Sequence, residues 1–113
     1  MKIEREIIDN IIVLTPTFRV MEDMFWGERL IGFEEEFKED SDYILNMINI
    51  KFIDSSGIGK IIGICLDLKE KNKKFCISNT TEIIKSVFYS MRLDEIVPIE
   101  DNIQKAIERI KKI

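Results

Sequence analysis

The residues best placed to do chemistry in this chain form one short segment, Asp54-Ser55-Ser56-Gly57-Ile58-Gly59. The segment follows an apolar run and precedes a stretch with helical apolar spacing, so we expect it at a turn from a strand into a helix. Asp and Ser side chains at such a turn accept hydrogen bonds from the first N–H groups of the helix, and glycine permits a tight turn. One capping side chain would suffice, whereas this turn holds an Asp and two adjacent hydroxyls.

A serine hydroxyl at a helix N-terminus is well placed to carry a phosphate. The free N–H groups and the positive end of the helix dipole tolerate the added negative charge. A phosphate would add about −1.5 to −2 charges beside Asp54, which changes what the surface can bind without unfolding the domain. On the residues alone, a phosphorylation switch and a simple helix cap explain this turn equally well.

Catalytic signatures are absent from the sequence. The chain has no His, which removes the commonest general base, the commonest metal ligand and every His-dependent triad. It also lacks a Gly-Lys-Ser/Thr phosphate loop, GxGxxG, GxSxG and a calcium-binding loop. The consecutive Glu34, Glu35 and Glu36 point in different directions on a predicted helix and are expected to be solvated. We therefore expect no enzyme activity, no metal and no cofactor.

Length, composition and charge limit the class of protein. The chain has 113 residues, of which 45% are hydrophobic and 34% charged, which is typical of one globular domain spanning residues 1–113. Lys and Arg number 17 against 21 Asp and Glu, a formal net charge of −4. Binding to phosphate-rich surfaces needs a clustered basic face, so we expect neither nucleic acid nor membrane as a partner.

The cellular compartment is inferred from the cysteines and the apolar segments. Cys65 and Cys76 have apolar neighbours and fit no CxxC spacing, so we expect small core residues in a reducing compartment. The N-terminus is charged where a signal peptide would be apolar. The longest apolar region, 58–68, is too short to span a bilayer. These features predict a cytoplasmic protein.

Alternating strand and helix patterns predict an α/β domain with a mostly parallel central sheet, an N-terminal hairpin and about four helices. The hairpin would turn at Asp9-Asn10, and Pro16 would end its second strand. Asp101 is expected to cap the last helix. Strands are expected at 3–8, 11–15, 43–48, 75–77 and 96–99. Helices are expected at 21–39 and 58–69 and at two later segments. The helix that begins at 80 would have an apolar face of Ile83, Ile84, Val87, Phe88 and Met91, and the helix that begins at 101 would turn Ile103, Ala106, Ile107 and Ile110 inward.

The first predicted helix carries an apolar stripe of Trp26, Leu30, Phe33 and Phe37. The neighbouring Met21, Met24 and Phe25 make it more apolar than one buried stripe requires. Core packing is the favoured use of this cluster, with a ligand or partner surface as the alternative. The Ile-rich first strand and this helix could form a dimer interface or could belong to the core. We therefore expect a monomer or a weak homodimer.

The segment 45–59, which contains Asp54-Ser55-Ser56-Gly57-Ile58-Gly59, resembles the signature of the STAS domain, found in bacterial anti-sigma-factor antagonists and in sulfate transporters. The similarity extends through the short strand 75–78, the helix end 88–93 and the following 94–97. The resemblance implies a single STAS-like domain over residues 1–113.

The resemblance also implies a partner-switching protein of bacterial transcription regulation. In that family the first serine after the Asp accepts the phosphate, which here is Ser55. The unphosphorylated protein would bind an anti-sigma factor that is also a serine protein kinase, and phosphorylation would break the complex until a serine phosphatase restores it. The ATP belongs to the kinase, so no cofactor is implied. The docking surface would include Asp54, Ser56, Gly57, Ile58, Gly59 and Lys60.

One segment departs from the family pattern. The turn after the second strand usually reads Gly-x-Leu-Asp, whereas here residues 15–19 are Thr-Pro-Thr-Phe-Arg, with neither the Gly nor the Asp. The alternative function is therefore a STAS-like module that is not phosphorylated, either a scaffold subunit or a sensor of a small ligand.

Overall fold

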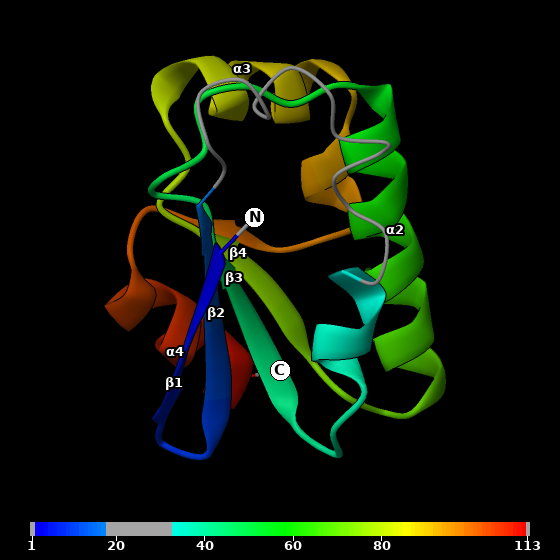
Figure 1. Ribbon diagram of the computed structural model, residues 1–113, viewed down its shortest axis with the longest axis vertical. Coiled ribbons are helices and arrows are strands. Elements are labelled where there is room, and N and C mark those ends of the chain that lie inside the picture. Colours follow the sequence, from blue (N-terminus) through cyan, green and yellow to red (C-terminus); the bar gives the residue numbers. More distant parts are fainter. Residues whose placement is uncertain (1, 18–32, 113) are drawn as a thin grey trace.

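An antiparallel hairpin opens the fold, and the computed structural model describes residues 2–17 and 33–112 of the chain (Figure 1). Strands β1 (Lys2–Ile8) and β2 (Ile11–Thr17) are joined by Asp9 and Asn10, whose φ angles are 52° and 65°. Positive φ at both central residues is what a type I′ turn requires. The predicted hairpin is confirmed. Pro16, however, does not end β2, which continues to Thr17. Strand β2 pairs with β3 only as far as Leu14, so the missing N–H of Pro16 removes no hydrogen bond to β3.

The sheet has five strands in the order β1-β2-β3-β4-β5. Strands β3 (Asp42–Asn46), β4 (Phe75–Ser78) and β5 (Ile99–Glu100) continue it in parallel from β2, and only β1 runs antiparallel. The sheet is therefore mixed: the predicted hairpin is its one antiparallel pairing, and the other three pairings among the described strands are parallel, as expected. The short β3 and β4 are almost entirely buried, as central strands between two layers should be.

Three α-helices belong to the described residues: α2 (Ser55–Glu70), α3 (Glu82–Ser90) and α4 (Ile103–Lys112). Two 3₁₀ helices accompany them, η1 (Phe33–Phe37) and η2 (Leu93–Glu95). The predicted helix 21–39 mostly lies outside the described residues, as do Met21, Met24, Phe25, Trp26 and Leu30. Its described part is the 3₁₀ helix η1, so the count of about four α-helices is corrected to three for residues 2–17 and 33–112.

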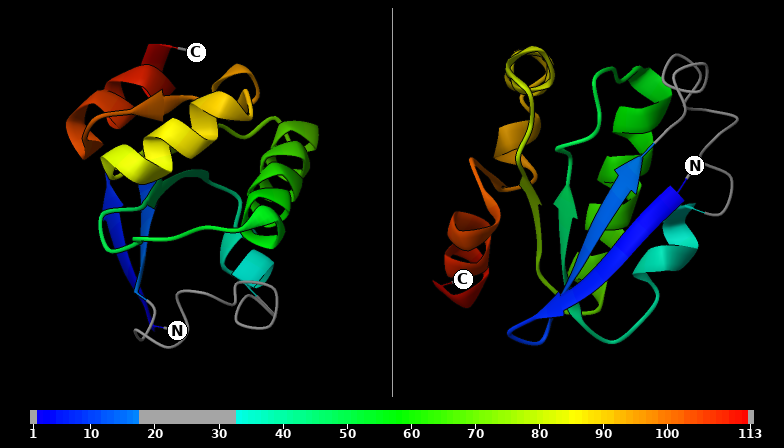
Figure 2. Two further views of the ribbon diagram at one scale, coloured as in Figure 1. Left: turned by 90° about the horizontal axis from the view of Figure 1, so that it is seen from above. Right: turned by 60° about the vertical axis from the view of Figure 1, so that its left-hand side comes forward.

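The helices cover the two faces of the sheet unequally. Helix α4 packs on one face, while η1 and α2 pack on the other, and α3 lies across the end of the sheet where α2 begins (Figure 2). The larger core joins alternate strand residues such as Leu14, Leu45 and Ile77 to the buried sides of η1, α2 and α3. The smaller core joins Ile44 and Cys76 to α4. Ile44 and Leu45 are consecutive and belong to different cores, because side chains alternate along a strand.

The last strand and the last helix cap differ from the prediction. Strand β5 begins at Ile99 instead of Ile96, because η2 turns the chain over residues 93–95. It pairs on one side only, so Pro98 lies next to an edge strand, as expected. The cap of α4 is Asn102, whose Oδ1 accepts from the backbone N–H of Lys105 at 2.8 Å. Asp101 instead binds the ammonium groups of Lys85 and Lys105.

The apolar faces of α3 and α4 follow the prediction except at Ile83 and at Met91, which lies just beyond the end of α3 and is 53% exposed. Ile84 and Phe88 of α3 are buried, and in α4 the buried residues are Ala106, Ile107 and Ile110. Ile83, however, is 71% exposed. Helix α3 lies at the end of the sheet, and only the side that carries Ile84 and Phe88 reaches the core.

Both cysteines are free thiols in the core, as the sequence predicted. Burial raises the pKa of Cys65, and it raises the pKa of Cys76 to about 12. Thiols with such pKa values stay protonated near neutral pH and are poor nucleophiles. The two cysteines therefore act as packing residues.

Membrane-spanning helices are absent from residues 2–17 and 33–112, since none of the helices there combines sufficient length with sufficient hydropathy.

Candidate functional site

The loop between β3 and α2 is held in place by the neighbouring strands. The backbone N–H of Met47 donates to the carbonyl of Ser78 at the end of β4 at 2.9 Å. On the other side, Asn49 Nδ2 donates to Thr17 Oγ1 at the end of β2 at 3.0 Å. Ile50 and Ile53 of the loop are buried. These contacts place the start of α2 at the carboxyl end of the parallel strands.

Asp54 is the N-cap of α2, which begins at Ser55 rather than at the predicted Ile58. Its backbone is extended, and its Oδ1 accepts from the N–H of Gly57 at 2.9 Å. Its carbonyl accepts the first helical hydrogen bond, from the N–H of Ile58 at 3.1 Å. This is the arrangement of an Asp N-cap. The helix-cap explanation of the sequence is therefore correct for Asp54.

Ser55 and Ser56 occupy the first turn of α2 and are exposed. The hydroxyl groups of both serines have no hydrogen-bond partner among the described residues, and neither do their backbone N–H groups. Since Asp54 already caps the helix, the serine hydroxyls are not needed for capping. Free N–H groups at the positive end of a helix can receive the oxygens of an anion. The first turn of α2 thus has a nucleophilic hydroxyl, solvent access and donors for a phosphate.

The remaining predicted site residues divide between surface and core. Gly59 is exposed, and a side chain there would meet only open space. Lys60 is half-buried and its Nζ lies 3.1 Å from Glu34 Oε2 of η1. The pKa of Glu34 is lowered by a hydrogen bond from its own backbone N–H and by this ammonium group. Gly57 and Ile58 are buried, and the Ile58 side chain packs into the larger core, so it does not reach the surface.

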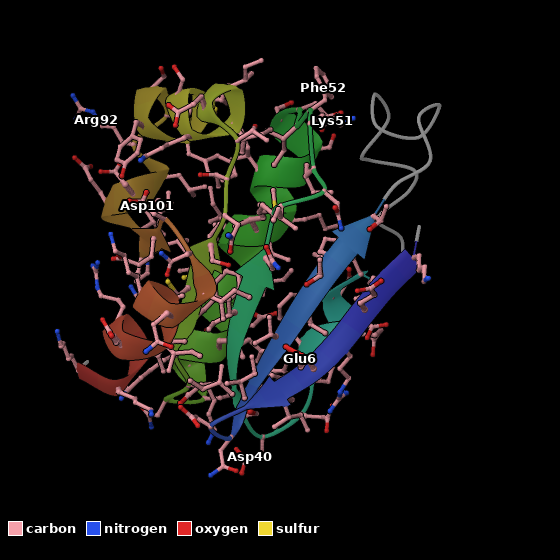
Figure 3. The ribbon with its side chains drawn as sticks, turned by 90° about the vertical axis from the view of Figure 1, so that its left-hand side faces the viewer. Glu6, Asp40, Lys51, Phe52, Arg92 and Asp101 are labelled. Atoms are coloured by element: carbon pink, nitrogen blue, oxygen red, sulfur yellow. The ribbon has the colours of Figure 1, made fainter. Side chains whose placement is uncertain are left out.

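Exposed apolar side chains lie at the same end of the molecule as Ser55, and the sequence analysis did not find them. Ile48 is 56% exposed and Phe52 42%, both in the loop before α2. Figure 3 shows Phe52 and Lys51 at the end where α2 begins. On the neighbouring α3 and just beyond it, Ile83 and Met91 are also more than half exposed. An apolar Phe two residues before Asp54 was the available signal for this surface.

No group of three or more Cys, Asp or Glu side chains in residues 2–17 and 33–112 is arranged to hold a metal ion. What the site offers is a modifiable hydroxyl beside a carboxylate, next to apolar surface that a partner can cover.

Replacing Asp54 by Ala should lower the free energy of unfolding by about 1 kcal/mol, because the N–H of Gly57 loses its acceptor. Asp54→Asn should retain most of the stability, since Asn caps a helix about as well. Urea unfolding monitored by circular dichroism measures both. The control is Asp67→Ala, at an exposed position in the same helix. Equal losses for Asp54→Ala and Asp67→Ala would contradict a capping role.

Comparison with known proteins identifies the family of this domain. The family model for the STAS domain matches residues 26–106. A candidate anti-sigma factor antagonist of Thermotoga maritima is 24% identical over 108 residues, covering 95% of this chain and 96% of the relative.

Solved structures show the same fold. The crystal structure of a candidate anti-sigma factor antagonist from Thermotoga maritima superposes with a TM-score of 0.78 at 22% identity, covering 96% of this chain and 94% of that one. The Bacillus cell fate determinant SpoIIAA in its phosphorylated form superposes with a TM-score of 0.60 at 17% identity, covering 96% and 99%. With a five-stranded mixed sheet, three described α-helices and a family match over more than half of its length, the chain belongs to the STAS domain family.

Proposed function

We propose that this protein is an anti-sigma-factor antagonist of a partner-switching pathway. In its unmodified form it binds an anti-sigma factor that is also a serine kinase, and phosphorylation of Ser55 by that kinase releases it. The observation that carries the proposal is the first turn of α2, where Asp54 takes the capping role and leaves an exposed Ser55 hydroxyl free to react.

The local charge supports a switch by phosphorylation. A phosphate on Ser55 would lie beside the Asp54 carboxylate, and the free N–H groups of Ser55 and Ser56 would offset part of its charge within the helix. The fold would therefore persist while the surface became strongly negative. A partner that docks over this turn and over the exposed Ile48 and Phe52 would then face an unfavourable buried charge.

The relatives support the same function. One is a candidate anti-sigma factor antagonist, and another, SpoIIAA, has a structure in a phosphorylated form. In this role the protein is a substrate of the kinase and of a serine phosphatase rather than an enzyme, and it needs no cofactor. We propose a cytoplasmic location, because bacterial transcription takes place in the cytoplasm and both cysteines are free thiols, as is usual in a reducing compartment.

The test is phosphorylation of the full chain by a serine kinase of the anti-sigma type from the same organism, with ATP. We expect the intact mass to increase by one phosphate, and peptide mapping to place that phosphate on Ser55. The matched variants are Ser55→Ala, which should accept no phosphate, and Ser56→Ala, which should accept one like the wild type. Phosphorylation that persists in Ser55→Ala would contradict the assignment of Ser55.

The alternative is a STAS-like module without phosphorylation. Its supporting observation is the end of β2, where the usual acidic turn residue is absent and the Thr17 hydroxyl instead binds Asn49 of the loop before α2. An unchanged mass after incubation with an active kinase, together with a ligand-induced rise in melting temperature, would favour this alternative.

A further inference from the structure

A cavity of about 260 Å³ lies at the far end of α2 from Ser55. It is bounded by Cys65 and Lys69 of α2, by the first residues of β4, by η2 and by Arg109 of α4. Asp40, whose carboxylate binds a lysine of the cavity wall, lies at the opposite end of the molecule from Phe52 (Figure 3). None of the residues that line the cavity belongs to the proposed docking surface.

The cavity exists because β5 is too short to cover β4. Strand β5 pairs with β4 only at Ile77 and Ser78. Beside Phe75 the sheet therefore has an open edge, and the chain passes around it through η2 and Pro98. The resulting walls are apolar, formed by Phe75, Ile96, Pro98 and the thiol of Cys65.

The thiol contributes to the apolar character of this wall. Cys65 is buried, and its Sγ lies 3.7 Å from the carbonyl oxygen of Ile96. Because burial raises its pKa, the side chain stays neutral near pH 7. A neutral thiol behaves as a small apolar group and does not repel an anion.

Positive charge predominates around the opening. Lys69, Lys73, Lys74 and Arg109 line the cavity, against two carboxylates, both from η2. Arg109 is neutralised by Glu100 at 2.7 Å and Lys73 by Asp40 at 2.9 Å.

Two ammonium groups of the lining have no carboxylate partner among residues 2–17 and 33–112. Lys74 Nζ donates to the carbonyl oxygen of Ile110 at 3.3 Å, and Lys69 makes no ion pair there. Lys69 belongs to α2 and Lys74 directly precedes β4, whereas both carboxylates of the lining come from η2. Apolar walls next to ammonium groups that form no ion pair favour a ligand with an apolar part and a negative head.

We propose that this cavity binds a small amphipathic carboxylate, with its head near Lys69 and Lys74 and its apolar part against Phe75 and Ile96. The volume corresponds to about eight or nine water molecules, which is below the range of drug-sized ligands. A carboxylic acid with a short alkyl chain or one aromatic ring is of this size. The proposal does not depend on the phosphorylation of Ser55.

The test is an NMR titration of the ¹⁵N-labelled full chain with sodium octanoate. We expect saturable shifts of the amide signals of Phe75 and Ile96, with Ser55 unaffected. Lys69→Gln should weaken binding about five-fold, as expected for a partly solvated ion pair. The matched control is Lys71→Gln, which removes the same charge from an exposed position outside the lining and should bind like the wild type. Octanol, which lacks the negative head, should bind at least about five-fold more weakly than octanoate.

Several outcomes would overturn the proposal. Absence of saturation up to about 10 mM octanoate would exclude a specific site with a Kd in the millimolar range or below. Shifts centred outside the cavity would exclude its location. Equal binding of octanol, or equal binding by Lys69→Gln in a variant whose amide spectrum shows the native fold, would exclude recognition of the carboxylate.

Discussion

Ser55→Asp should weaken binding to the cognate anti-sigma kinase by about 100-fold or more, whereas Ser55→Ala should bind like the wild type. Ser55 is exposed in the first turn of α2, and its hydroxyl makes no hydrogen bond within the described residues that Ala would remove. A carboxylate there adds a charge beside Asp54, and burying an unpaired charge in an interface costs several kcal/mol. A loss of about 2.7 kcal/mol corresponds to 100-fold in Kd. Isothermal titration calorimetry measures the effect.

The control for this experiment separates a local effect from a change in net charge. Gln104→Glu adds the same charge at an exposed position of α4, on the other face of the sheet. It should bind like the wild type. If Ser55→Asp and Ser55→Ala both bind like the wild type, the switch at Ser55 is wrong. If both lose binding while circular dichroism shows intact folds, Ser55 is a contact residue and not a phosphorylation switch.

Phe37→Ala should lower the free energy of unfolding by about 3–5 kcal/mol. Phe37 is 3% exposed and lies among three other aromatic rings. The ring centroids are 5.0 Å from Tyr43, 5.4 Å from Phe33 and 5.7 Å from Phe75. Such tilted and edge-on contacts add to the burial of the ring itself. The loss is a large part of the 5–15 kcal/mol that stabilises a typical domain. Urea unfolding measures it.

Two further variants make this stability prediction specific. Phe37→Leu keeps much of the volume and should lose less than Phe37→Ala. Leu66→Ala removes an apolar side chain that is 51% exposed on α2, and it should change stability by about 1 kcal/mol or less. A loss for Phe37→Ala no larger than that for Leu66→Ala would mean that η1 does not hold its aromatic residues in the core.

Local interactions explain why much of the fold was predictable. The Asp9-Asn10 turn is formed by two residues that tolerate positive φ. The Asp54 and Thr81 caps each bond to an N–H three residues later. Alternating and helical apolar spacings identify which residues are buried, because each period belongs to one backbone geometry. Signals of this kind depend on neighbours in the sequence, so no tertiary information is needed.

The errors of prediction have a common cause. Ile96 and Val97 have the apolar, β-branched character of a strand, but η2 occupies the chain just before them and β4 offers a partner only from Ile99 onward. Ile83 matches the apolar spacing of α3 but faces solvent, since only one side of α3 contacts the core. Asp101 and Asn102 are both good caps, and the structure uses Asn102 as the cap while the Asp101 carboxylate pairs with Lys85 and Lys105. In each case a contact with another element, β4, the core or Lys85 of α3, contributed to the outcome.

The sequence by itself determined the α/β class, the N-terminal hairpin, the turn at Asp54 and Ser55 and the resemblance to the STAS family, because these depend on residue types at short spacing. Only the tertiary structure decided which site residues reach the surface: Ser55, Ser56 and Gly59 are exposed, while Ile58 packs into the core. Only the structure brings α3 to the end of the molecule where α2 begins, so that the exposed Ile83 of α3 joins the exposed Ile48 and Phe52 of the loop before α2, and only the structure leaves a cavity beside Phe75. The physical reason is that exposure and concavity arise from how separate elements pack, and the packing joins residues that the sequence holds far apart.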